Sequence, residues 1–118
     1  MASEGFHEAA DGLTPRTRDL HRALVSLQEE LEAIDWYQQR VDAAGDPALR
    51  DILAHNRDEE KEHAAMVLEW LRRHDDVLDR YLRRYLFTER PIVALEADEA
   101  DANGAATRGA AIGSLRRR

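Results

Sequence analysis

The chain has 118 residues, enough for one small domain around a single core. It contains no cysteine, so disulfide bonds and thiolate metal ligands are excluded, and a metal ion would need oxygen or imidazole ligands. The net charge of −7 argues against a nucleic-acid-binding protein, and the apolar runs are too short to cross a membrane. The first residues lack the basic and apolar regions of a signal peptide, so we expect a cytosolic protein.

The N-terminal part of the chain is expected to lead from a flexible segment, residues 1–14, into a long helix. No proline or glycine occurs between Pro15 and Gly45, and the stretch is rich in Leu, Glu, Arg and Ala, which favour helix. This pattern predicts a helix over about residues 17–44. Apolar residues at spacings of three and four give it one apolar stripe, formed by Leu20, Leu24, Leu27, Leu31, Ile34 and Val41.

A second long helix is predicted after the break at residues 45–47, with Asp46 as its cap and Pro47 at its first position. Its apolar stripe consists of Leu49, Ile52, Leu53, Val67, Trp70 and Leu71. A turn near residues 74–76 then leads into a shorter third helix, and one more helical turn is expected around residues 92–95. The apolar residues of the third helix are Val77, Leu78, Tyr81, Leu82, Tyr85 and Leu86.

These elements predict an all-α fold, an antiparallel two-helix hairpin plus a short third helix, within a domain of residues 15–96. The Ala, Gly, Asp and Asn content that follows predicts a flexible linker over residues 97–109. Two long helices cannot enclose a four-helix core alone, whereas two hairpins can. We therefore expect a four-helix bundle completed by dimerisation.

Two polar side chains fall inside the apolar stripe of the second helix, on a helical wheel of about 100° per residue. They are Glu60 and His63, whereas Asp58 and Glu62 point away from the stripe. Buried charges are costly without a compensating partner. The Glu-x-x-His spacing puts both side chains on one face, as in carboxylate-bridged di-metal helical bundles. The alternative is a buried, hydrogen-bonded Glu60–His63 pair without metal.

The first helix offers a third candidate ligand, Glu30, at the border of its apolar stripe. Tyr37 lies two turns further along the same side. It could donate a hydrogen bond to the ligands or act as a redox-active neighbour. The alternative is an ordinary core residue with its hydroxyl at the rim. A di-iron bundle site uses two such glutamates and two Glu-x-x-His pairs, so one chain holds half a site. A two-fold axis would supply the other half, and its four carboxylates would balance two divalent ions.

A further group lies on the opposite side of the first helix, where Glu29 and Glu32 accompany Val25 and Trp36. The two apolar residues suggest a second packing surface. The two acids either guide cations inward or are simply solvated.

Several segments closely resemble the encapsulated ferritins. Residues 29–37 read Glu-Glu-Leu-Glu-Ala-Ile-Asp-Trp-Tyr and resemble the first-helix motif of that family. Residues 54–66 read Ala-His-Asn-Arg-Asp-Glu-Glu-Lys-Glu-His-Ala-Ala-Met and, with Leu-Glu-Trp-Leu at 68–71, resemble its second helix. Residues 85–89, Tyr-Leu-Phe-Thr-Glu, extend a match that covers roughly residues 24–95.

This resemblance implies a ferritin-like four-helix bundle and a ferroxidase whose di-iron centre, with two iron ions per subunit pair, forms at a subunit interface. It also implies an annular decamer, a ring of five dimers. The matched positions are Glu30, Glu60 and His63 for the metal ligands, Glu29 and Glu32 for metal entry, and Trp36 and Tyr37 for the aromatic pair near the site.

The C-terminal residues 110–118 contain a second resemblance, to the short peptide that docks cargo onto the inside of an encapsulin shell. The residues that carry it are Ile112, Gly113, Ser114 and Leu115, followed by arginine. The segment departs from the usual pattern because Ala-Ala at 110–111 replaces a typical Leu-Gly pair, which removes one apolar anchor. The alternative is a tail without function. The resemblance implies an encapsulin shell protein as partner and a nanocompartment in a bacterial or archaeal cytoplasm as location.

The identity of the metal does not follow from the ligands, because oxygen and imidazole suit manganese and zinc as well as iron. The choice of iron as the metal therefore rests on the family resemblance. Two other functions stay open: a non-catalytic helical scaffold or adaptor that dimerises through the same stripes, and a metal-dependent hydrolase on a similar bundle.

Overall fold

A computed structural model of the chain describes residues 5–98, which hold helices and no β-strand. The elements are a 3-10 helix η1 (Ala10–Gly12) and the α-helices α1 (Pro15–Ala43), α2 (Pro47–His74) and α3 (Asp76–Tyr85). The helical turn expected around residues 92–95 is present, and it extends to residue 98, into the first two positions of the expected flexible linker. The predicted all-α hairpin with a short third helix is confirmed. None of the described helices is long and apolar enough to cross a membrane.

Helix α1 begins at Pro15, two residues earlier than the apolar pattern predicted. Thr14 is its cap, and the Thr14 hydroxyl accepts a hydrogen bond from the backbone N–H of Thr17 at 3.0 Å. Proline fits the first position because the backbone N–H that it lacks has no partner within a helix at that point. Arg18 Nη1 also donates to the carbonyl of Ala10 at 2.8 Å, which links α1 to the preceding 3-10 helix.

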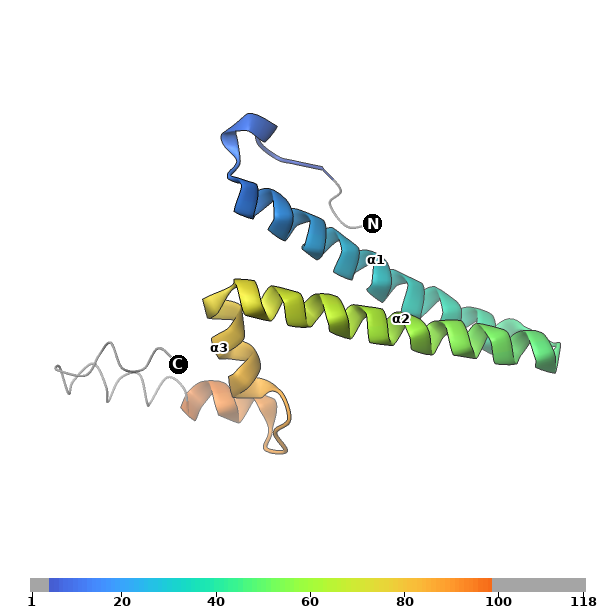
Figure 1. Cartoon of the computed structure of the whole chain (residues 1–118). Coiled ribbons are helices and arrows are strands. Elements are labelled where there is room, and N and C mark those ends of the chain that lie inside the picture. Colours follow the sequence, from blue (N-terminus) through green and yellow to red (C-terminus); the bar gives the residue numbers. More distant parts are fainter. Residues whose placement is uncertain (1–4, 99–118) are drawn as a thin grey trace. The chain divides into compact units, whose positions relative to one another are not determined.

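The turn between α1 and α2 is closed by side chains that bond to its backbone. Asp46 Oδ2 accepts from the N–H of Leu49 at 2.8 Å, so the predicted cap of α2 is confirmed. Arg50 Nε donates to the Ala44 carbonyl at 3.1 Å, and its Nη2 donates to the Gly45 carbonyl at 3.3 Å. The two helices therefore turn back on each other and run antiparallel (Figure 1).

Helices α1 and α2 pack against each other, and on both of them buried or half-buried residues recur seven apart; we call this line of residues the hairpin seam. On α1 the seam residues are the half-buried Leu20, Leu27, Ile34 and Val41. On α2 they are Arg57, Ala64 and Leu71, and the latter two are the buried residues of that helix, at 9% and 2% exposure. Seven-residue spacing is typical of helices that pack nearly antiparallel.

Much of the apolar surface of this hairpin is uncovered within one chain, including part of the single apolar stripe predicted for the first helix. Leu24 is 48% exposed and Leu31 is 53% exposed, so these two leucines lie outside the seam. On α2, Ile52 and Met66 are exposed at 58% and 63%. The physical reason is that one neighbouring helix covers only a narrow part of each stripe. The remaining apolar area has the character of an interface.

The described residues 75–98 belong to a second compact unit, which contains α3. Asp75 caps α3, since its Oδ1 accepts from the N–H of Leu78 at 2.9 Å. Asp79 is 3% exposed and accepts from Arg83 Nε at 2.9 Å, one turn along the same helix. The expected linker over 97–109 lies outside the described residues except for its first two positions, and the peptide at 110–118 lies outside them entirely.

The last turns of α2 contain an ion cluster that makes a pH dependence predictable. Glu69 accepts hydrogen bonds from Arg72 Nε at 2.8 Å and Arg73 Nε at 2.7 Å, and these contacts lower the pKa of Glu69 to about 2. Because this pKa is below the usual glutamate value of 4.5, the ion cluster stabilises the helix above about pH 4.5, and this stabilisation is lost as the pH falls toward 2.

We expect Glu69→Gln to flatten the loss of thermal stability between pH 4.5 and pH 2. Helix melting followed by circular dichroism at several pH values measures this directly. Glu62→Gln is the matched control, because it neutralises an exposed glutamate on the same helix. An acid transition of unchanged steepness in Glu69→Gln contradicts the assignment.

Candidate metal centre

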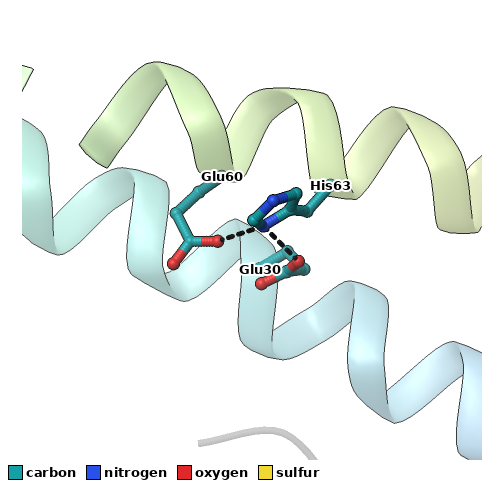
Figure 2. A group of neighbouring side chains, drawn as sticks. All are labelled: Glu30, Glu60 and His63. Carbon is teal, nitrogen blue, oxygen red and sulfur yellow. Dashed lines mark hydrogen bonds and ion pairs between the residues drawn. The ribbon is translucent and has the colours of Figure 1, made fainter. Parts of the chain in front are cut away.

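Glu30 from α1 meets Glu60 and His63 from α2 in one cluster (Figure 2). His63 Nδ1 lies 3.0 Å from Glu60 Oε1 and 3.4 Å from Glu30 Oε2. One potential ligand atom from each residue falls within 4.8 Å of the others. The hairpin thus brings together the three residues that the sequence singled out as candidate ligands.

The hairpin geometry explains why these residues meet. Glu30 precedes Gly45 by fifteen residues and Glu60 follows it by fifteen, so an antiparallel turn places both at the same height. His63 follows Glu60 by three residues, which puts it about one turn along the same face. Figure 2 shows the two α2 side chains directed toward Glu30.

The cluster is only partly shielded in a single chain. The side chains of Glu30 and Glu60 are 23% exposed and that of His63 is 47% exposed. The expectation that Glu60 and His63 both lie in a buried stripe therefore holds only in part, because one hairpin supplies only one wall around them. The Glu60–His63 contact of the metal-free alternative is present at 3.0 Å. That alternative requires a buried pair, however, and the His63 side chain is about half exposed.

Electrostatics reflect the crowding of two carboxylates. Desolvation raises the pKa of Glu30 above its usual value, and the hydrogen bond and charge of Glu60 raise it further. The pKa of His63 is raised mainly by its hydrogen bond to Glu60, with the charge of Glu30 adding to the effect. Two acids that compete for protons and one imidazole between them form an environment that favours a bound cation.

The donor set defines which ions fit. Two carboxylates and one imidazole, with no thiolate in the chain, suit iron, manganese and zinc. Three protein ligands leave coordination positions open on any of these ions. The cluster also matches half of the ligand set of a di-metal four-helix bundle, which takes two glutamates and two Glu-x-x-His pairs.

The other predicted site residues of the described chain lie on α1 and are not part of this cluster. Glu29 is exposed and Glu32 is half-buried, and the charge of Glu29 makes a small contribution to the raised pKa of Glu30. Trp36 is 50% exposed. The ring of Tyr37 is half-buried and has the Arg40 guanidinium carbon 5.0 Å from its centroid.

One contact near the cluster was missed by sequence reasoning. Arg57 Nη1 donates to Gln38 Oε1 at 2.9 Å, a side-chain hydrogen bond between α2 and α1. The sequence does indicate the helix face of Arg57, which stands seven residues before Ala64, but it does not indicate the partner on α1. Arg57 was left out of the predicted apolar stripe because arginine side chains are usually solvent-exposed.

A long antiparallel helical hairpin with an inward Glu, Glu and His cluster defines a ferritin-like protein with a candidate metal site. The chain belongs to the EncFtn-like family, whose profile matches residues 5–89. This confirms the family resemblance drawn from the sequence.

Individual relatives agree with this family. An "Encapsulated ferritin-like protein" from Rhodospirillum rubrum is 59% identical over 104 residues, which are 88% of this chain and 74% of the relative. A "Ferritin-like protein" from Thermotoga maritima is 53% identical over 96 residues, 81% of this chain and 84% of the relative. The crystal structure of protein ne0167 from Nitrosomonas europaea matches with a TM-score of 0.72 and 60% identity, covering 75% of this chain and 97% of that one.

Proposed function

We propose that this protein is a ferroxidase, which oxidises Fe(II) to Fe(III) with dioxygen at a di-iron centre shared by two copies of the chain. The observation that carries the proposal is the cluster of Glu30, Glu60 and His63, whose potential ligand atoms lie within 4.8 Å of one another. Family membership supports the choice of iron over the other ions that fit this donor set.

Sharing the centre between two copies follows from the number of ligands. One chain supplies one glutamate and one Glu-x-x-His pair, and a two-fold axis supplies the same set again. The four carboxylates then balance the charge of two divalent ions. The exposed apolar residues of the hairpin, such as Leu31 and Ile52, give the copies a surface to bury. The family resemblance further suggests that five such dimers assemble into a ring, and we include this decamer in the proposal.

Each ligand has a chemical role in this proposal. The carboxylates of Glu30 and Glu60 would hold ferrous ion, and their negative charge would stabilise the higher charge of the ferric product. His63 binds through a ring nitrogen in its neutral form. Each ferrous ion loses one electron to dioxygen. Consumption of two irons per dioxygen gives hydrogen peroxide, and four gives water, so the measured ratio identifies the product.

Residues outside the cluster have supporting roles in the proposal. Glu29 and Glu32 attract ferrous ion toward the ligands, because both carry negative charge on the helix that holds Glu30. Trp36 and Tyr37 lie further along α1 and form the aromatic neighbourhood of the site.

The proposed setting is an encapsulin nanocompartment in a bacterial or archaeal cytoplasm. A hairpin dimer or an open ring encloses no mineral cavity, so storage of the ferric product needs a container. The name of the R. rubrum relative, an encapsulated ferritin-like protein, supports this setting. The segment Ile112, Gly113, Ser114 and Leu115 is the proposed docking peptide for the shell.

Deleting residues 110–118 is expected to abolish co-purification with a co-expressed encapsulin shell protein, because it removes the apolar anchors at Ile112 and Leu115. Ferrous oxidation by the purified protein should be unchanged. Replacing the three terminal arginines by serine while keeping the apolar residues is the control, and it should retain most of the shell-bound protein. Full retention after the deletion rejects the docking role.

The rival function is a helical scaffold or adaptor without catalysis. Anaerobic loading with ferrous ion followed by addition of oxygen separates the two. A ferroxidase converts the loaded iron much faster than buffer does, whereas a scaffold gives the buffer rate. Binding of metal without faster oxidation would reject catalysis and leave a structural metal site.

A further inference from the structure

A chain of hydrogen-bonded polar side chains crosses the hairpin about one turn from Glu60 along α2 and about two turns from Glu30 along α1. Arg57 Nη1 of α2 donates to Gln38 Oε1 of α1 at 2.9 Å. Gln38 in turn donates from Nε2 to Asp42 Oδ1 at 3.0 Å, and Arg57 Nε donates to Asp58 Oδ1 at 3.0 Å. Both partners of the crossing bond are thus held by a second contact on their own helix.

Arg57 occupies an unusual place for a charged residue. Its side chain is only 20% exposed, and it lies in the hairpin seam seven residues before the buried Ala64. An apolar residue at this position would pack against α1 at lower desolvation cost. A single polar residue at a seam position is a known means of fixing how two helices align, at some cost in stability.

The alignment of α1 with α2 matters most where the ligands meet. The turn fixes the helices at Gly45, but Glu60 lies fifteen residues away, about 22 Å along the helix. Small rotations of α2 about its own axis therefore remain possible at that distance. Metal sites require ligand positions within about 0.5 Å of the productive geometry. The apolar seam residues tolerate such a rotation, whereas a directional hydrogen bond does not.

We infer that Arg57, through its bond to Gln38, is a positioning residue for the metal centre. It stands three residues, about 4.5 Å along the helix, before Glu60. The bond to α1 fixes the rotation of α2 at that point and thereby sets Glu60 and His63 opposite Glu30. This inference rests on the proposed metal site, but it does not depend on iron oxidation.

The test compares Arg57→Met and Gln38→Met with the wild-type chain, using Co(II) as the metal probe. Each variant should bind Co(II) about tenfold more weakly, which is the lower end of the effect seen when residues that support metal ligands are mutated. The visible absorption bands of the bound Co(II) should also shift. The double variant should lose no more than either single variant, because both changes break the same bond. Arg57→Lys combined with Gln38→Glu, which restores a cross-helix ion pair, should recover binding.

The matched control is Arg22→Met, the same substitution at an arginine whose side chain is 70% exposed in an ion pair with Asp19. A metal-free measurement accompanies it. The chain has no cysteine, so spin labels at introduced cysteines, Asp35→Cys on α1 and Glu62→Cys on α2, report the distance between the helices. Labelled chains are diluted with unlabelled ones, and Arg57→Met should broaden the distance distribution whereas Arg22→Met should not.

The outcomes separate this inference from the proposed function. Wild-type protein that binds Co(II) but oxidises no ferrous ion rejects the ferroxidase and leaves the positioning role in place. Co(II) affinities and spectra of Arg57→Met and Gln38→Met equal to those of Arg22→Met overturn the positioning role. If the wild-type chain binds no Co(II), the label distances decide, and distributions of equal width overturn it.

Discussion

His63→Ala is expected to slow ferrous oxidation more than about 100-fold, since loss of a metal ligand exceeds the effect of losing the groups that support one. His63 supplies the imidazole of the cluster, and its Nδ1 lies 3.0 Å from Glu60 Oε1. Glu30→Ala and Glu60→Ala are expected to reduce the rate similarly. The measurement is anaerobic loading with ferrous ion, followed by the appearance of ferric absorbance after oxygen is added.

Glu59→Ala is the matched control for the two glutamate substitutions. Glu59 is exposed, adjacent to Glu60 in the chain and outside the cluster, so its removal changes the net charge equally without removing a ligand. We expect its rate to stay within about twofold of the wild type, a change worth less than about 0.5 kcal/mol of activation free energy. Unchanged rates in all three ligand variants reject the catalytic centre, even if the protein binds iron elsewhere.

The sequence was sufficient to predict that Glu30, Glu60 and His63 lie together because the relevant information is local. Glu60 and His63 share a face through their spacing of three, and caps at Thr14, Asp46 and Asp75 determine where the helices begin. An antiparallel turn at equal distances from Glu30 and Glu60 then brings the ligands together. None of these steps depends on the details of side-chain packing.

The burial of individual side chains and their partners on the other helix could not be predicted from the sequence, because they depend on what packs against each helix face. A helical wheel assigns Leu24, Leu27 and Leu31 to one stripe, but only contact with α2 distinguishes the half-buried Leu27 from the exposed leucines. The bond between Arg57 and Gln38 also escaped, because it depends on the relative rotation of two helices. The sequence pattern gives the direction of a side chain but not its partner.

Metal binding is expected to stabilise the folded assembly strongly, because the ligands come from separate helices and, in the proposal, from separate chains. A ligand at about 100 times its dissociation constant contributes about 2.7 kcal/mol to the free energy of unfolding. For a chain of 118 residues this corresponds to a rise in Tm of about 10 °C. Anaerobic calorimetry with and without ferrous ion measures the shift, and native mass spectrometry measures the accompanying change from monomer to dimer or larger assemblies.

Glu30→Gln is the variant that separates metal binding from ordinary packing. It keeps the shape of the side chain but removes one of two neighbouring carboxylates; desolvation, followed by the hydrogen bond and charge of Glu60, raises the pKa of Glu30. The metal-free Tm should therefore rise slightly, while the ferrous-dependent increase in Tm and in mass should be largely lost. A ferrous-dependent shift of wild-type size in Glu30→Gln contradicts the shared site, since the ion then stabilises the protein from somewhere else.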